Sequence, residues 1–399
     1  SRGLGDVYKR QLQLKPREEA RIKAGHLWVY RDELVHVPEA PGGTLVRVLT
    51  HDGTSLGTGF YNPISKIAVR MLGGEVESAD ETFFTRRFAQ AQALRERVLP
   101  GENAYRVVFG EADLMSGLIV DRYDNVFVLQ MLAAGMDVRI DAIVAAIRAV
   151  FPDVEGIMEK NTMQTRVKEG IEMREGVVWG KVPESVDIVE NGIKLRVDLH
   201  GGQKTGYFLD QKLNRRTVGA LSRGKRVLDC FCNVGGFALN AAQVGAAEAV
   251  GIDSSTPAVE AARRNAELNG FANAHFEKAN VFDDLRARIE REERWDIIVL
   301  DPPSFAKARN AIKGALAGYA ELNRTAMKLL STNGILVTAS CTQLVPEATL
   351  MDIMYREAAR LRKRLRLLHR GEQAPDHPVL LAMPETQYLK FLVFDVIDA

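Results

Sequence analysis

The sequence predicts an α/β protein whose C-terminal part forms a doubly wound, mostly parallel sheet. From Arg226 onward, short β-branched runs alternate with segments of helical periodicity, which is typical of parallel strands joined by helical crossovers. The chain has 399 residues, too many for one compact core, so we expect two or three domains. The expected strands are 226–229, 248–252, 274–278, 295–300 and 334–340, followed by a helix at 347–362 and strands near 365–369 and 388–396.

The composition is that of an ordinary globular protein, with 46% apolar and 26% charged residues. The net charge is +1, so a nucleic-acid surface would have to be a local basic patch. Three cysteines in a chain of this length argue against a disulfide framework and for a reducing compartment. We find no apolar run of membrane-spanning length and no signal-peptide pattern, and therefore expect a cytoplasmic protein without a membrane partner.

Three segments precede the C-terminal domain. Residues 1–11 match no periodic template, so we set them aside as a non-native tail. Residues 12–73 hold short β-type runs separated by turn residues, which predicts a small β-rich domain that ends near Gly73. Residues 74–195 should form a central α+β domain, and 196–399 the third domain. The expected elements of the central domain are helices at 80–99 and 137–150 and strands at 105–109, 118–120, 126–132, 154–158 and 193–199. They frame a polar stretch at 159–187.

A glycine-containing loop from Asp229 to Gly236 follows the first strand of the α/β part and precedes an Ala-rich helix. Glycines let the backbone approach a ligand closely, and the start of the helix supplies unpaired N–H groups. The loop does not have the G-x-G-x-x-G pattern, so a dinucleotide site is poorly supported. Asp253 ends the second strand, where a carboxylate commonly holds ribose hydroxyls. The alternative is an ordinary βαβ turn with acids that face solvent.

Two further strand ends carry chemically useful side chains. Asp301 is followed by two prolines, which fix φ and would hold a rigid loop beside the cleft. This motif could also simply stop a strand. Cys341 follows the strand at 334–340, where its thiol could act as a nucleophile, although a free cysteine is more often a small buried hydrophobe. Glycine loop, carboxylate and thiol together indicate a methyl-transfer site with a cysteine nucleophile.

Three other features allow more than one interpretation. Cys230 and Cys232 have no further ligand at metal spacing, so packing and close approach to the cofactor are better interpretations than a metal site. The loop at 202–211 could fold over a nucleoside or could link two domains. The basic run from Arg360 to Arg366, with Arg370, could bind RNA phosphates or form a solvated helix end.

The chain resembles the bacterial large-subunit ribosomal RNA cytosine-C5 methyltransferase I family, over nearly everything after residue 11. The glycine loop and the Asp-Pro-Pro motif are common to many methyltransferases, whereas two motifs are more specific to this family. These are Lys-Thr-Gly-Tyr-Phe-Leu-Asp-Gln at 204–211 and Asp-His-Pro-Val at 376–379. Other shared segments are 14–17, 26–30, 110–113 and 117–122.

The resemblance implies a PUA domain at 12–73, a central α+β domain and a class I, Rossmann-like methyltransferase domain. It implies S-adenosylmethionine as cofactor and 23S ribosomal RNA as partner, and it leaves a homodimer open. The cofactor contacts that it implies are Asp229, Asn233, Gly235, Asp253, Asn280, Gln211 and Asp301. Asn280 stands where related methyltransferases often have Asp for the adenine.

The reaction that the resemblance implies uses Cys341 as the nucleophile at C6 of cytosine and Asp301 to grip the base edge. Another branch of cytosine-C5 enzymes has a second cysteine where this chain has Ser304. Lys204 and His377 are weak candidates for the base that removes the C5 proton. Three alternatives remain open. They are methylation of an exocyclic amine or a guanine without a thiol, an RNA-binding module that has lost catalysis, and a small-molecule methyltransferase, for which the N-terminal β-rich module would be hard to explain.

Overall fold

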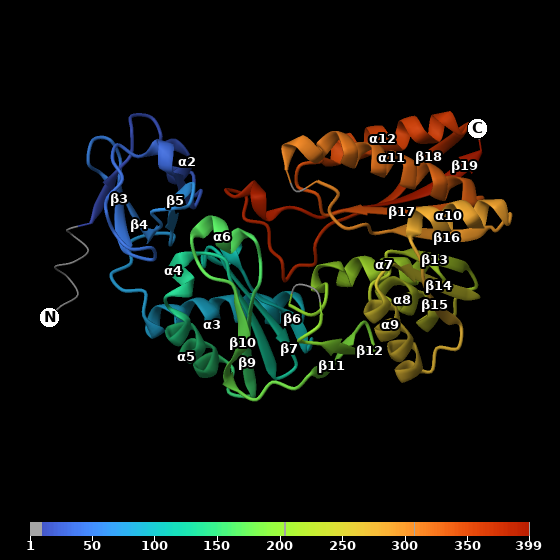
Figure 1. Ribbon diagram of the computed structural model, residues 1–399, viewed down its shortest axis with the longest axis horizontal. Coiled ribbons are helices and arrows are strands. Elements are labelled where there is room, and N and C mark those ends of the chain that lie inside the picture. Colours follow the sequence, from blue (N-terminus) through green and yellow to red (C-terminus); the bar gives the residue numbers. More distant parts are fainter. Residues whose placement is uncertain (1–9, 203–204, 307, 399) are drawn as a thin grey trace. The chain divides into compact units, whose positions relative to one another are not determined.

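The computed structural model describes residues 10–202, 205–306 and 308–398. The chain divides into two compact units, and each is built from several segments of the sequence (Figure 1). Unit 1 comprises Ser1–Ile188, Val197–Leu209 and Pro375–Thr386, and unit 2 comprises Val189–Arg196, Asp210–Ala374 and Gln387–Ala399. Among the described residues, no helix has both the length and the apolar character needed to cross a membrane.

Unit 1 begins with a five-stranded sheet in the order β1-β3-β4-β5-β2. Its strands are β1 (Gln11–Gln13), β2 (Trp28–Tyr30), β3 (Leu45–Leu49), β4 (Ser55–Tyr61) and β5 (Ile67–Met71), with a short helix α2 (Ala20–Lys23) and a 3-10 turn η1 (Arg31–Glu33). β1 pairs in parallel with β3, so Gln11, which we had set aside with the tail, belongs to the sheet. Met383, from a much later segment of the chain, completes the core of this module.

The rest of unit 1 is an α+β layer around the sheet β10-β9-β8-β7-β6, in which only β8 and β9 run parallel. Helices α3 and α5 pack against each other and contribute to one large apolar core. The elements are α3 (Glu81–Val98), β6 (Ala104–Phe109), η2 (Gly110–Asp113), β7 (Leu118–Tyr123), β8 (Val126–Met131), α4 (Ala134–Asp137), α5 (Ile140–Val150), β9 (Gly156–Asn161), α6 (Thr165–Glu169) and β10 (Arg174–Gly180).

The stretch at 159–187, which we expected to be merely polar, contains the edge strand β10. None of its residues is fully buried, and its two core contacts, Val178 and Trp179, are adjacent in sequence, so no apolar–polar alternation marks the strand. A hairpin of β11 (Ser185–Glu190) and β12 (Ile193–Asp198) follows, and it turns at Asn191 and Gly192. Both turn residues have positive φ, 53° and 81°, as a two-residue hairpin turn requires.

Unit 2 contains a seven-stranded sheet in the order β15-β14-β13-β16-β17-β19-β18. The first five strands are parallel, and β19 runs antiparallel between β17 and β18. Their bounds are β13 (Arg226–Cys230), β14 (Glu248–Asp253), β15 (Ala274–Lys278), β16 (Trp295–Leu300), β17 (Leu330–Ser340), β18 (Lys363–Gly371) and β19 (Lys390–Asp398). The central strands are buried on both faces, which explains their nearly continuous apolar sequences.

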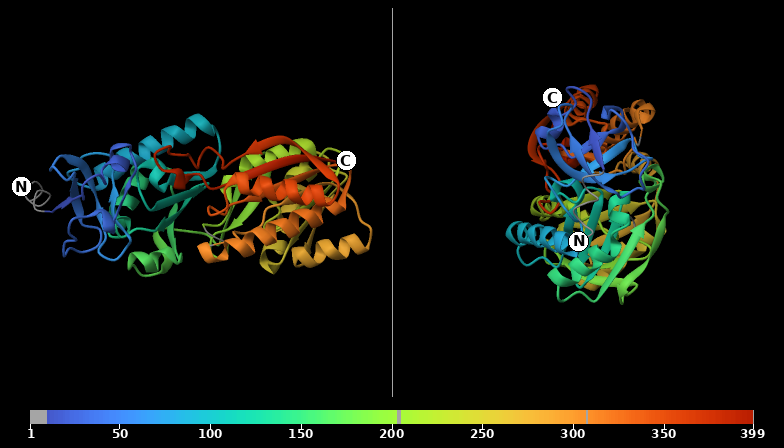
Figure 2. Two further views of the ribbon diagram at one scale, coloured as in Figure 1. Left: turned by 90° about the horizontal axis from the view of Figure 1, so that it is seen from above. Right: turned by 90° about the vertical axis from the view of Figure 1, so that its left-hand side faces the viewer.

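Helices cover both faces of this sheet, as Figures 1 and 2 show. One face carries α7 (Lys212–Leu221), α8 (Gly236–Gln243) and α9 (Thr256–Asn269), and the other carries α10 (Val281–Glu290), α11 (Ile312–Leu329) and α12 (Glu347–Arg360). Short 3-10 turns are η3 (Leu209–Gln211), η4 (Arg309–Ala311) and η5 (Pro384–Thr386). The doubly wound arrangement places the carboxyl ends of the parallel strands along one edge, where ligands bind in such sheets.

Candidate active site

Four side chains with reactive or charged groups stand at this carboxyl edge in unit 2. Asp229 lies near the end of β13, Asp253 ends β14, Asp301 follows β16 and Cys341 follows β17. The parallel register joins Cys230 of β13 with Ile252 of β14 and with Leu300 of β16, so these strand ends are level with one another. The edge therefore brings together three carboxylates and one thiol from four strands.

The loop after β13 has an unusual backbone. Phe231, Asn233 and Gly235 all have positive φ, at 66°, 49° and 89°. For the two non-glycine residues this conformation costs free energy and is maintained only by the surrounding contacts. One such contact is the 3.0 Å hydrogen bond from the Asn233 N–H to Oδ2 of Asp253, whose Oδ1 accepts from the Ser255 N–H at 2.9 Å. The backbone thus fixes the Asp253 carboxylate at the rim of the loop.

Asp229 is fully buried beneath that loop. Its Oδ2 accepts a 3.0 Å hydrogen bond from the Ala238 N–H in the first turn of α8, whereas its buried Oδ1 has no hydrogen-bond partner among the described residues. Burial raises the pKa of Asp229 to about 7, and the nearby Asp301 charge adds to this effect, although the bond from Ala238 opposes it. A buried acceptor without a partner is costly, so this carboxylate is suited to a ligand that donates a hydrogen bond or carries positive charge.

Gly235 is required by contacts inside the protein. A Cβ atom at this position would lie 2.7 Å from Cζ of Phe276 and 3.1 Å from Cβ of Ala262. The positive φ also favours glycine here. We expected this glycine to permit close approach of a ligand, but the close approach that the structure shows is to the Phe276 ring.

Gln211 and Asp301 are joined directly. Gln211 Nε2 donates to Oδ2 of Asp301 at 3.0 Å, and Gln211 Oε1 accepts from Asn214 Nδ2 at 2.6 Å. Asn214 also donates to the backbone carbonyl of Glu372 at 3.1 Å. Sequence reasoning missed Asn214, although its spacing of three residues from Gln211, across the start of α7, could have indicated the contact.

Asn280 is exposed and forms the N-cap of α10. Its Oδ1 accepts from the N–H groups of Phe282 at 3.0 Å and Asp283 at 3.4 Å. Such a cap satisfies N–H groups that have no partner within the helix. The amide oxygen therefore has a structural role, and the Nδ2 group makes no hydrogen bond with the described residues.

The loop that carries Cys341 is held by hydroxyl groups. The Tyr319 hydroxyl of α11 lies 2.8 Å from the Ser340 hydroxyl and 2.9 Å from that of Thr342, which also lies 3.2 Å from the Ser304 hydroxyl. This network links the Asp-Pro-Pro loop to the loop after β17. Burial, and then the charges of Cys341 and Asp301, raise the pKa of Tyr319, so the thiol and the carboxylate act on one neighbour.

Cys341 differs from the other two cysteines in its accessibility. It is partly exposed, whereas Cys230 and Cys232 are buried. Burial raises the pKa values of both Cys230 and Cys232, which keeps these thiols protonated. This agrees with the packing role that we expected for them. Among the residues that the structure describes, no group of three or more His, Cys, Asp or Glu side chains could hold a metal ion.

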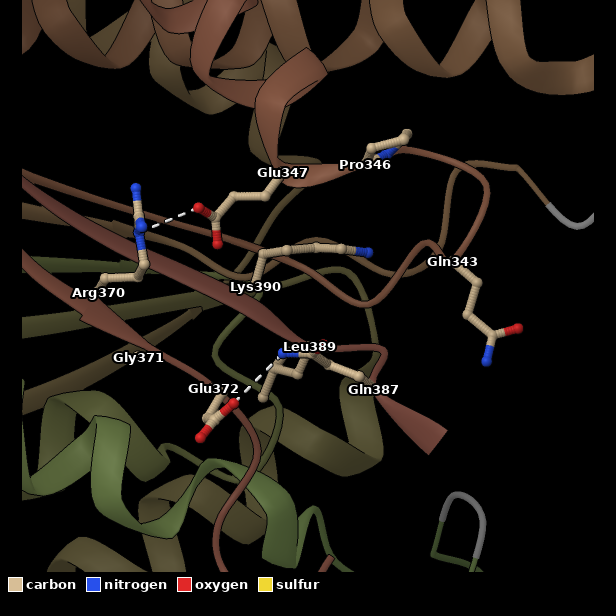
Figure 3. A pocket seen from close by; sticks show the side chains of 9 residues that line it. All are labelled: Gln343, Pro346, Glu347, Arg370, Gly371, Glu372, Gln387, Leu389 and Lys390. Atoms are coloured by element: carbon tan, nitrogen blue, oxygen red, sulfur yellow. Dashed lines mark hydrogen bonds and ion pairs between the residues drawn. The ribbon is translucent and has the colours of Figure 1, made fainter. Parts of the chain in front are cut away.

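A pocket of about 580 Å³ opens beside the Cys341 loop (Figure 3). Lys390 at the start of β19 lines it, together with Gln343 and with Glu347 at the start of α12. Its other lining residues are Pro346, Arg370, Gly371, Glu372, Gln387 and Leu389. The lining mixes amides with charges of both signs, and this chemistry suits a polar ligand better than an isolated phosphate.

Most of the basic run lies in the edge strand β18. The helix end that we offered as one interpretation therefore includes only Arg360, the last residue of α12. Much of the charge of the run is compensated within unit 2. Ion pairs join Arg360 to Glu357, Lys363 to Asp398, Arg366 to Asp395 and Arg370 to Glu347. This pairing weakens the interpretation that the run is a phosphate-binding patch.

His377 belongs to unit 1 and has structural contacts there. It is buried, with Nδ1 2.9 Å from Oδ1 of Asp376 and its ring centre 5.3 Å from that of Phe109. Asp376 in turn accepts from the Arg106 N–H at 2.9 Å. Lys204, the other candidate base, lies outside the described residues.

Comparison with known families gives two matches. A PUA-like domain model matches residues 12–73, and an S-adenosylmethionine-dependent methyltransferase model matches residues 164–394. Relatives named ribosomal RNA large subunit methyltransferase I include one from Shewanella amazonensis, 39% identical over 390 residues, which cover 96% of this chain and 98% of the relative. Another, from Vibrio campbellii, is 38% identical over 385 residues, which cover 94% and 96%.

Solved structures show the same fold at lower identity. A candidate SAM-dependent methyltransferase from Streptococcus mutans superposes with a TM-score of 0.82 at 23% identity, covering 97% of this chain and 100% of its own. A second candidate methyltransferase, complexed with SAH, gives a TM-score of 0.84 at 23% identity with the same coverage.

Proposed function

Because the chain belongs to the S-adenosylmethionine-dependent methyltransferase family, we propose that it methylates C5 of a cytosine in 23S ribosomal RNA through a covalent bond from Cys341 to C6. Relatives that span nearly the whole chain are named as large-subunit ribosomal RNA methyltransferases, which supports this class of substrate. The observation that carries the chemistry is the place of Cys341. It is the one cysteine that is not buried, and it stands at the same sheet edge as Asp301.

The residues of the glycine loop fit S-adenosylmethionine. The buried, unpartnered Oδ1 of Asp229 suits the amino group of the cofactor, and the fixed carboxylate of Asp253 suits its ribose hydroxyls. Asn233, Gly235, Gln211 and Asp301 would line the same site, and Nδ2 of Asn280 would be available to the adenine. Bound S-adenosylmethionine supplies a methyl group on a sulfonium, which is a strong electrophile.

The protein must make C5 of cytosine nucleophilic, because the aromatic ring leaves it a weak nucleophile. The Cys341 thiol loses its proton, and the thiolate adds to C6, so the electron pair of the C5–C6 double bond becomes available at C5. After C5 has gained its methyl group, a base removes the C5 proton. The electron pair then restores the double bond as the thiolate leaves C6. Asp301, held by Gln211, would grip the amino edge of the base during these steps.

The target base must leave its stack to reach the thiol. The pocket beside Cys341 would receive part of the RNA strand that carries it, and the PUA-like module at 12–73 would hold the RNA elsewhere. We retain 74–195 and 196–399 as the central and methyltransferase domains. A homodimer and a cytoplasmic location also remain predictions, and sedimentation of the purified protein would test the first.

Transfer of labelled methyl groups to large-subunit RNA that lacks modifications tests the reaction, with nucleoside analysis of the product. We expect 5-methylcytidine from the wild type and none from Cys341→Ala, whereas the control Cys230→Ala, which removes a buried thiol, should retain activity. Label on a different nucleoside in both variants would support the second candidate, methylation of an exocyclic amine or a guanine. That reaction needs the carboxylate of the Asp-Pro-Pro motif but no thiol, and the bond from Gln211 to Asp301 is compatible with it.

A further inference from the structure

We propose that Lys390 is a positioning residue that keeps Cys341 in its thiolate form through a fixed ammonium group beside the loop after β17. The inference deepens the proposed function, because it takes Cys341 as the nucleophile. Its physical content can nevertheless be measured without any methyl transfer.

The sheet register places Lys390 next to Cys341. β17 and β19 run antiparallel and pair Ser340 with Lys390, so the lysine side chain starts opposite the residue that precedes the cysteine. Its Nζ donates to the backbone carbonyl of Thr342 at 2.8 Å and to that of Tyr388 at 3.0 Å. The ammonium group is therefore anchored at two points, the loop after β17, which carries the thiol, and the segment just before β19.

This anchoring accounts for two of the three N–H donors of the ammonium group. The third is left for the pocket that Lys390 lines with Gln343 (Figure 3). A lysine whose only role was to hydrogen-bond these two backbone carbonyls would not need to line a pocket. The charge of Lys390 therefore faces a pocket that opens beside the Cys341 loop.

The charges around the thiol show why a cation is needed. Burial lowers the pKa of Lys390, and the negative charges of Cys341 first and then Glu347 oppose this effect. The charges of Cys341 and of Asp301, which follows β16, both act on the Tyr319 hydroxyl of α11, so the three groups share one neighbourhood. Arg370 of β18 already pairs with Glu347 at 3.0 Å.

Among these groups, only Lys390 combines a positive charge with a direct hydrogen bond to the Cys341 loop. Asp301 and Glu347 would both disfavour a thiolate, because like charges repel. The ammonium group offsets that repulsion. Without it, a thiolate would face these carboxylates uncompensated, and the protonated thiol would be favoured.

The rate of Cys341 alkylation by iodoacetamide, followed by mass spectrometry across pH, tests this inference in the full chain. Lys390→Gln removes the charge but can still donate to a carbonyl, whereas Lys390→Arg retains the charge. Lys363→Gln is the matched control, because Lys363 lies on the neighbouring strand β18 and is paired with Asp398 at the end of β19. Cys230 and Cys232 are buried and should stay unlabelled in every variant that keeps its fold.

We expect the midpoint of the alkylation profile to rise by about one pH unit in Lys390→Gln, with a rate at pH 7 about tenfold below wild type. Lys390→Arg should restore most of the rate, and Lys363→Gln should match the wild type. Unchanged alkylation in Lys390→Gln, with Cys230 and Cys232 still protected, would overturn the inference. If Lys390→Gln exposes the buried cysteines, Lys390→Met provides the same comparison with an apolar side chain of similar length.

Failure of the proposed function would look different. If Cys341→Ala still transferred methyl groups while Lys390→Gln shifted the alkylation profile, the cysteine would not be the nucleophile, yet the electrostatic pairing would stand. If Cys341 is the nucleophile and Lys390 stabilises its thiolate, the pH profile of methyl transfer by Lys390→Gln should shift upward in parallel with alkylation. Activity should then recover at higher pH.

Discussion

Gln211 Nε2 donates a 3.0 Å hydrogen bond to Oδ2 of Asp301, across 90 residues of sequence. The bond joins the segment before α7 to the loop after β16, and Asn214 fixes the amide by donating to its oxygen. Gln211 is almost completely buried, so water does not compete for this contact. One oxygen of the Asp301 carboxylate is therefore already committed, and the orientation of this side chain is set.

Replacing Gln211 by Ala should lower kcat/KM for methyl transfer by about 10- to 100-fold. Hydrogen bonds to charged groups contribute about 1.5–3 kcal/mol, and their loss would leave Asp301 free to rotate. Steady-state kinetics with labelled S-adenosylmethionine measures the change. Gln243→Ala is a suitable control, because that side chain makes a 3.0 Å bond to the Asn191 carbonyl elsewhere in unit 2. Equal kcat/KM for wild type and Gln211→Ala would show that the contact does not orient Asp301.

The raised pKa of Asp229 should make stability depend on pH. The group titrates near 3.8 when unfolded and at about 7 in the native protein, so the native state binds the proton more tightly between these values. Stability from this group is present below pH 3.8 and is lost as pH rises through 7, by up to about 4 kcal/mol. Urea unfolding of wild type and Asp229→Asn at pH 4–8 should show this loss in the wild type only. A difference in unfolding free energy between the two proteins that stays constant over this pH range would contradict the prediction. Asp296→Asn serves as the reference variant.

The same carboxylate should couple cofactor binding to pH. A ligand ammonium favours the ionised form of Asp229, so affinity for S-adenosylmethionine should increase as pH rises toward 7. Calorimetry in buffers of different ionisation enthalpy would detect the proton released on binding below pH 7. Asp229→Asn should bind more weakly and release no such proton. Proton release that persists in Asp229→Asn would assign it to another group.

Gly235→Ala should destabilise the protein by more than strain at positive φ alone explains. Gly270 also has positive φ, but a Cβ there would meet nothing within 4 Å, so Gly270→Ala measures the backbone cost, about 1 kcal/mol. At Gly235 the added methyl would also meet the Phe276 ring at 2.7 Å, for about 1–3 kcal/mol more. Thermal unfolding of the two variants gives the difference. The extra loss should shrink when Phe276→Leu is present, and equal losses at both glycines would argue against the clash.

The α/β fold could be predicted because its strands are recognisable in the sequence. β13, β14, β16 and β17 are buried runs of branched residues, and the family matches and solved structures confirm a methyltransferase fold with a PUA-like domain at the N-terminal end. β10 escaped detection because it is an edge strand with no fully buried residue and no apolar–polar alternation in its sequence. The sequence of β4 shows little alternation, because glycines at 57 and 59 replace the side chains that would reveal it, and a Cβ at Gly59 would lie 2.5 Å from Val69.

For the candidate site, the sequence could predict which residues stand at the ends of the parallel strands, but not the contacts that orient them. Asp229, Asp253, Asp301 and Cys341 were expected together because parallel strands end at one edge, and the structure places them there. The contacts that orient them were not accessible in this way. Lys390 reaches Thr342 from 48 residues away through an antiparallel pairing that local sequence does not specify, and no local pattern indicated the Tyr319 hydroxyl network.

The most direct test of the central claim is a trapping experiment with RNA that contains 5-fluorocytidine. Fluorine at C5 cannot leave as the proton does, so the bond from the thiol to C6 should persist after methyl transfer. We expect a denaturation-resistant protein–RNA complex that requires S-adenosylmethionine, maps to the peptide of Cys341 by mass spectrometry, and is absent from Cys341→Ala. Methylated RNA without any such complex, or a bond to a different residue, would contradict the account.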